Sequence, residues 1–406
     1  MINIGFLCKF AIRIRLIMKK RILMAMMLCV AISAAAQQDK DASAGEQSLF
    51  EKVTNIEKKQ DNFHLLLNLN NSFDVNQGNG ELESAKFNMH EIRIEAKGKV
   101  NDTFSFRWRQ RLNRSNAPTP DGLDNMPATS IDIAGIGVKF NDVVSMFLGK
   151  QCAAYGGFEY DTNPIEIYQY SDMLDNMSIF LTGATLQLQL SPDHQLQLQA
   201  VDSRSASMSD MYGEGYEQSK VPLVYSVNWN GNFGGVLSTR WSYSIMSQAK
   251  GYQSHYVALG NQLKLNNFDA FLDVMYMREG IDREGIVSRI VGNNALGGHQ
   301  NDAEYLSMVL KAQYRFNPKW SVFAEGMLDN EGFSKSNGVI EKGKYRTAYG
   351  YLAGLEFYPI KNSNLHFYLT YVGRHYSYTD RAKAFGADDY STNRISLGYI
   401  WQLPMF

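Results

Sequence analysis

Apolar and polar residues alternate with a period of two over most of this chain. The clearest case is 186–200, where leucines alternate with glutamines on both sides of a short turn at 191–193. A period of two places successive side chains on opposite faces of a β-strand. This segment therefore predicts a hairpin with one apolar face and one polar face.

The same pattern recurs often enough to predict sixteen strands. Their expected spans are 62–75, 84–100, 103–113, 129–140, 143–151, 178–191, 194–202, 221–230, 233–247, 254–266, 268–278, 303–316, 319–328, 346–358, 364–376 and 393–403. Short polar turns such as 101–102 and 266–267 alternate with long polar, Gly-rich segments. The longest of these are 152–177, 203–220, 279–302, 329–345 and 377–392.

This alternation is typical of bacterial outer-membrane barrels, which have short periplasmic turns and long outer loops. An even number of strands returns both chain ends to the periplasm. A barrel of sixteen strands is too wide for side chains to fill, so an aqueous channel is expected inside it. The predicted fold class is all-β, a sixteen-stranded antiparallel transmembrane β-barrel over 62–406.

The first 61 residues predict export rather than part of the barrel. Six basic residues precede an uncharged stretch that ends in Ala34, Ala35 and Ala36, so 1–36 is expected to be a signal peptide. Met18, followed by three basic residues, is a second candidate start. The segment 37–61 is predicted to be polar and then to form a short amphipathic periplasmic helix. That helix could cap the barrel mouth or contact other subunits, and the sequence favours neither.

Composition excludes several functional classes. Removal of the signal peptide leaves 34 basic against 41 acidic residues and a single cysteine, Cys152. A negative mature chain argues against nucleic-acid binding, and one cysteine excludes an intrachain disulfide. No phosphate loop, nucleophile elbow or pair of metal-ligating histidines is present in the sequence, and no cofactor is implied.

Three segments resemble phosphate-selective porins of the O/P type. They are the opening hairpin around 87–107, the stretch 149–159 that enters the third loop, and the C-terminal strand ending at Phe406. The resemblance covers most of 50–406. It implies a trimeric porin whose third loop narrows the pore and whose arginines line a path for anions. It also implies that the barrel-assembly machinery reads Phe406.

A physical argument places three arginines in the lumen. Phe104, Phe106 and Trp108 occupy one face of their strand, so Arg107, Arg109 and Arg111 occupy the other. An arginine facing lipid near the midplane would cost roughly 2–4 kcal/mol. Arg93, Lys97 and Lys99 on the preceding strand are expected beside them, which predicts a basic wall suited to phosphate or carboxylate.

The alternative is that acidic residues neutralise this wall, so that it only shapes the field of the pore. The candidate partners are Glu95, Glu325, Glu356, Glu159, Asp161 and Glu166. With a negative mature chain, the sequence leaves open whether the channel prefers anions.

The third outer loop, 152–177, is unusually aromatic for a solvated segment. Tyr155, Phe158, Glu159 and Tyr160 are the residues expected to form a constriction when the loop folds into the barrel. Packing of the same aromatic residues against a neighbouring subunit is the other interpretation.

These observations predict a passive diffusion porin in the outer membrane of a Gram-negative bacterium. Its expected partners are small hydrophilic solutes or anions, outer-membrane lipid and two further copies in a homotrimer. One rival is a structural or adhesion barrel with an occluded lumen. Another is an outer-membrane hydrolase using Asp388, Asp389 and His375 near the last outer loop, although acidic pairs at loop tips usually serve other purposes.

Overall fold

The computed structural model describes residues 63–114, 130–292, 298–361 and 363–405. The expected signal peptide, the polar segment, the short N-terminal helix and Phe406 lie outside these ranges. In the described part, no helix is both long and apolar enough to cross a membrane.

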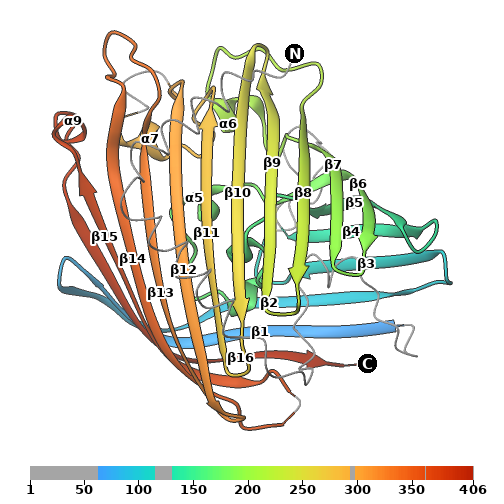
Figure 1. Cartoon of the computed structure of the whole chain (residues 1–406). Coiled ribbons are helices and arrows are strands. Elements are labelled where there is room, and N and C mark those ends of the chain that lie inside the picture. The colour runs from blue at the N-terminus through green and yellow to red at the C-terminus, as the bar shows by residue number, and fades with distance from the viewer. Residues whose placement is uncertain (1–62, 115–129, 293–297, 362, 406) are drawn as a thin grey trace. The chain divides into compact units, whose positions relative to one another are not determined.

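Sixteen strands close into one antiparallel barrel in which each strand pairs with its sequence neighbours and β1 pairs with β16 (Figure 1). The strands are β1 (Phe63–Gly78), β2 (Glu81–Lys99), β3 (Phe104–Arg111), β4 (Ile131–Lys139), β5 (Val144–Cys152), β6 (Phe180–Ser191), β7 (His194–Asp202), β8 (Leu223–Phe233), β9 (Leu237–Ala249), β10 (Tyr252–Lys264), β11 (Phe268–Glu279), β12 (Ala303–Asn317), β13 (Trp320–Phe333), β14 (Gly343–Phe357), β15 (His366–Tyr378) and β16 (Tyr390–Pro404). The predicted number and direction of the strands are confirmed.

The first hairpin and β13 are longer than predicted. An outer loop was expected at 76–83, but β1 and β2 continue to a two-residue turn at Asn79 and Gly80, whose φ angles are 49° and 86°. Asn-Gly with positive φ at both positions matches the twist of a hairpin. Similarly, β13 runs to Phe333, five residues past its predicted end at 328.

The burial pattern is inverted relative to a water-soluble domain. Leu310, Phe367 and Leu397 are 55%, 47% and 62% exposed, whereas Asn68, Gln197 and Asp273 are buried. Apolar side chains therefore cover the outside of the barrel and polar ones its inside. This inversion is what a closed sheet surrounded by hydrocarbon requires.

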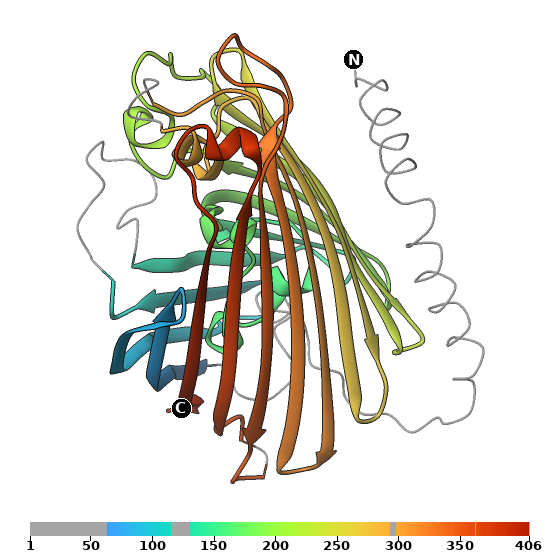
Figure 2. The ribbon, with the colours of Figure 1, turned by 90° about the vertical axis from the view of Figure 1, so that its left-hand side faces the viewer.

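The loops between strands carry the short helices. They are α4 (Phe158–Asp161), the 3-10 turn η1 (Pro164–Glu166), α5 (Asp172–Asn176), α6 (Met208–Tyr212), α7 (Ile286–Ile290) and α9 (Asp380–Lys383). The first three belong to the third outer loop, which lies between the barrel walls (Figure 2).

Candidate functional site: the third loop and the basic wall

The first half of the third loop is fixed to β9 and β11. Gly156 and Gly157 adopt φ angles of 70° and 87°, which turn the chain toward the far wall. Asp273 then accepts hydrogen bonds from the backbone N–H groups of Phe158, at 2.8 Å, and Glu159, at 2.7 Å. Asp161 forms an ion pair of 2.9 Å with a β9 arginine, Arg240.

The middle of the loop is fixed to β13–β16. The ring of Tyr168 stacks on Phe323 at 5.0 Å, and its hydroxyl donates to Glu356 at 3.0 Å. The guanidinium of Arg394 donates to the backbone carbonyl of Tyr168. On the β1 side, Asn70 donates to the carbonyl of Ile165 at 3.1 Å. Aromatic and charged contacts therefore hold the same loop segment from several directions.

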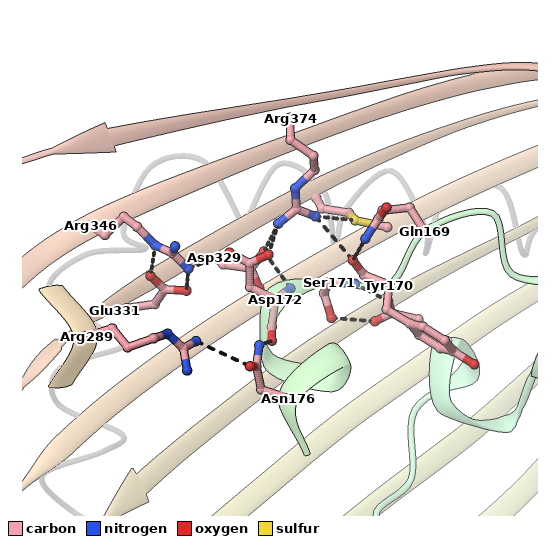
Figure 3. A network of polar contacts seen from close by, with 12 residues as sticks. Gln169, Tyr170, Ser171, Asp172, Asn176, Arg289, Asp329, Glu331, Arg346 and Arg374 are labelled. Carbon is pink, nitrogen blue, oxygen red and sulfur yellow. Dashed lines mark hydrogen bonds and ion pairs between the residues drawn. The ribbon is translucent and has the colours of Figure 1, made fainter. Parts of the chain in front are cut away.

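The end of the loop is fixed by five charged residues, here called the anchoring cluster (Figure 3). Asp172, in the first turn of α5, pairs with Arg346 at 2.5 Å and also with Arg374. Glu331 binds Arg346 through two nitrogens, and Asp329 lies 3.6 Å from Arg374. Because Asp172 is 174 and 202 residues from its two arginines in sequence, no local pattern predicts this cluster.

The four residues predicted to form the constriction all lie in this loop and are all buried. Tyr155 packs against Tyr160, with ring centroids 5.7 Å apart, and Phe158 stacks on the wall at Phe271. Both carboxylate oxygens of Glu159 accept hydrogen bonds, one from the backbone and one from the hydroxyl of Ser171. These side chains therefore make contacts within the loop and between the loop and the barrel wall.

Burial has a marked electrostatic effect on Glu159. It raises the pKa of the Glu159 carboxyl well above its usual value, although the hydrogen bonds from Ser171 oppose the rise. Loss of hydration penalises the charged form of a buried acid. This carboxyl is therefore a point where pH can act on the loop.

The predicted basic residues, here called the ladder, are Arg93, Lys97, Lys99, Arg107, Arg109 and Arg111. Cross-strand register places Arg93 opposite Arg111, Lys97 opposite Arg107 and Lys99 opposite Ser105. The side chains of Arg93, Arg107 and Arg109 are buried within the barrel, and that of Arg111 is 18% exposed. The guanidinium groups of Arg109 and Arg111 both lie over the ring of Phe180, at 5.2 and 5.6 Å from its centroid.

One carboxylate lies at the centre of the ladder. Asp132 is 2.8 Å from Arg111, 3.2 Å from Arg109 and 3.5 Å from Arg93. Arg107 pairs instead with Glu95 at 2.9 Å, and Glu91 pairs with Arg93 at 2.8 Å. The ladder is thus partly neutralised by three carboxylates.

Of the six acids proposed as its partners, Glu95 makes a direct ion pair with the ladder. Asp132 was missed. It lies between Ile131 and Ile133, where a pairing irregularity between β3 and β4 inserts one extra residue. A β-bulge redirects side chains in this way. The signal available in the sequence was an acid between two isoleucines on the strand next to three arginines.

The arrangement divides the barrel wall into two parts. The third loop is bonded to β1, β7, β9, β11 and β13–β16 through the contacts above and through Gln199. The ladder occupies β2 and β3, in the arc of wall between β1 and β7.

The residues proposed for a hydrolase have structural contacts. Asp389 accepts a hydrogen bond from the backbone of Tyr378 at 2.7 Å and pairs with Lys383, while His375 contacts Ser391. Among the described residues, no group of three or more His, Cys, Asp or Glu could hold a metal ion.

A closed sixteen-stranded barrel with a polar interior and an inward-folded third loop defines a channel-forming outer-membrane protein. The phosphate-selective porin O and P family matches residues 63–403, so the chain belongs to this family. It is an outer-membrane porin of a Gram-negative bacterium, and its family is one of channels rather than enzymes. No curated protein matches the chain significantly.

Solved structures share the fold at low sequence identity. The outer-membrane channel DcaP of Acinetobacter baumannii is 11% identical with a TM-score of 0.55, covering 85% of this chain and 99% of its own. The anion-selective porin from Comamonas acidovorans is 9% identical with a TM-score of 0.56, covering 84% and 99%. OmpF of Salmonella typhi is 14% identical with a TM-score of 0.54, covering 84% and 97%.

Proposed function

We propose that this porin passes small hydrophilic anions by passive diffusion and that the ladder sets its preference for anions. The observation that carries the proposal is the excess of positive charge in the ladder. The six basic ladder residues are paired with or lie beside three carboxylates, those of Glu91, Glu95 and Asp132, so the net charge of these nine side chains is +3. The solute gradient supplies the driving force, and no cofactor takes part.

Arginine suits this role because its planar guanidinium binds a carboxylate or phosphate through two parallel hydrogen bonds. The pair of Arg93 with Glu91, joined by hydrogen bonds of 2.9 and 2.8 Å, illustrates this binding mode within the ladder. A ring of charge at a narrow point favours ions of the opposite sign and repels those of the same sign.

The test is the reversal potential of the purified, reconstituted protein in a salt gradient. Replacing Arg107, Arg109 and Arg111 together by Ala should lower the anion-to-cation permeability ratio without loss of assembly. Arg381→Ala is the matched control, because Arg381 is an exposed loop arginine paired with Glu341. An unchanged ratio in the triple variant would refute the proposal.

We also propose that the protein is a homotrimer that associates through the wall of short strands. β3, β4, β5 and β7 have 8 or 9 residues each, whereas β12 and β14 have 15 (Figure 1). Tilted by about 40°, a strand of 8 or 9 residues spans about 21–23 Å, less than the apolar band of about 25 Å. Neighbouring subunits would shield this wall, and crosslinking in native outer membranes should yield trimers.

The rival with an occluded lumen is supported by the number of strands to which the third loop is bonded. It makes a different prediction for planar bilayers. A conducting channel gives discrete current steps with the purified protein, and a structural barrel gives none.

A further inference from the structure

A regular set of uncharged hydrogen-bonding side chains lies on the inner face of β6–β9. Register places Thr185, Gln199, Ser226 and Ser244 in one cross-strand row, and Gln187, Gln197, Asn228 and Ser242 in the next. Gln189, Gln195 and Asn230 form a third row, which on β9 ends at Arg240, the partner of Asp161. We call the eleven uncharged residues the amide array.

The array is bonded within itself and, through Gln199 and Ser242, to the third loop, but it is not saturated. Gln197 donates to Gln195 at 2.6 Å, and Gln199 donates to Thr185 at 2.8 Å. Gln187 Nε2, Asn228 Oδ1 and Asn230 Oδ1 have no hydrogen-bond partner among the described residues, although each side chain is more than nine-tenths buried. An amide without partners in such a place costs free energy.

The array differs chemically from the ladder. Guanidinium and ammonium groups only donate hydrogen bonds, whereas every side-chain amide carries both donors and an acceptor. A fully ionised phosphate or carboxylate accepts hydrogen bonds and cannot satisfy an amide oxygen. A hydroxyl group both donates and accepts hydrogen bonds. It is also uncharged, so it needs no counter-charge from the wall.

The array continues the wall directly from the ladder. Arg107 lies opposite Gly135 on β4, and that row runs on through Gly149 and Gly183. The next inward-facing row toward the periplasm joins Lys99 of the ladder to Thr185, through Ser105, Gly137 and Phe147. The first row of the array therefore continues a row of the ladder around the wall.

We propose that the amide array binds the hydroxyl groups of a polyhydroxylated anion, such as a sugar phosphate or a sugar acid, whose charged group is held by the ladder. The inference deepens the proposed function and rests on it for the charged end of the solute. Inorganic phosphate would use the ladder alone. A neutral sugar would use the array alone.

The test compares pairs of probes of similar charge that differ in hydroxyl groups. Glucose 6-phosphate is compared with inorganic phosphate, and gluconate with acetate, as blockers of the chloride current through the reconstituted wild-type channel. The half-blocking concentration should be about tenfold lower for the hydroxylated member of each pair, the gain expected from one or two additional hydrogen bonds.

The variant Gln187→Met with Asn228→Ala should remove this advantage and leave the values for phosphate and acetate unchanged. Asn228→Ser is a milder variant that replaces the amide by a hydroxyl, which still donates and accepts hydrogen bonds, and it should lose only part of the advantage. Gln253→Met changes an amide on β10 outside the array and is the control. Heat-modifiable mobility on gels shows that each variant has folded.

Three results would overturn the inference. One is an anion-selective channel in which the half-blocking concentrations are equal within each pair. This result would refute hydroxyl binding by the array and leave the proposed function intact. If the hydroxylated probes still block at lower concentration in the double variant, the array is not where their hydroxyl groups bind. A wild-type channel without anion selectivity would overturn the proposed function and this inference together.

Discussion

Two parts of the barrel wall place arginines beside acids, and they differ in net charge. In the ladder the basic residues outnumber their carboxylates, whereas in the anchoring cluster three carboxylates face two arginines, giving a net charge of −1. One wall keeps a positive field, and the other uses its charges to hold the third loop. Arginines in a lumen therefore indicate selectivity only when the acids around them are counted.

The two walls also differ in how their acids are supplied. Asp132 belongs to the same sheet as the ladder, one strand away. Asp172 belongs to the loop and crosses the lumen to reach β14 and β15. Loss of an ion pair in the ladder should therefore alter the field, and loss of one in the anchoring cluster should alter the position of the loop.

The largest expected effect comes from removing an arginine of the anchoring cluster. Arg374→Leu leaves Asp172 and Asp329 buried without this partner, and breaking a buried pair in this way costs about 3–5 kcal/mol. The free energy of unfolding in detergent should fall by that amount. Arg111→Leu, at an arginine 18% exposed, should cost clearly less. Equal losses in the two variants would contradict the distinction between the walls.

The next largest effect is on selectivity. Asp132→Asn removes the carboxylate shared by three guanidinium groups, so the anion-to-cation permeability ratio should rise. Asp329→Asn, the corresponding change in the anchoring cluster, should leave the ratio close to its wild-type value. Reversal potentials of both variants measure this directly. A rise with Asp329→Asn and none with Asp132→Asn would reverse our assignment of the walls.

The smallest expected effect is a pH dependence of the third loop. The folded pKa of Glu159 is raised above its unfolded value, so the folded state favours the protonated form. Its contribution to stability is present below pH about 4.5 and is lost as the pH rises toward the folded pKa. Protease cleavage within the loop should become faster over that range in the wild type, and Glu159→Gln should flatten the dependence. An equally steep profile in the variant would assign the effect to another group.

The sequence predicted the parts of this architecture that depend on local pattern. Strands are read from alternation, and the lumen side of Arg107, Arg109 and Arg111 follows from the aromatic residues between them. The Asn-Gly pair at 79–80 is a local pattern typical of a two-residue hairpin, and it accounts for the extra length of β1 and β2. β1, β2 and β13 extend beyond their expected ends.

The site itself depended on contacts that no local pattern contains. Asp132 faces the ladder through a pairing irregularity, and Asp172 meets arginines nearly half the chain away in sequence. Glu159 was expected at the constriction because it lies in an aromatic loop. Its burial against Ser171 follows from how that loop folds back on itself.

The most direct test of the account is the reversal potential of the wild-type protein in a tenfold gradient of potassium chloride. The positive excess of the ladder predicts a potential with the sign of chloride permeation. A potential with the sign of potassium permeation would show that the carboxylates, rather than the ladder, govern the path.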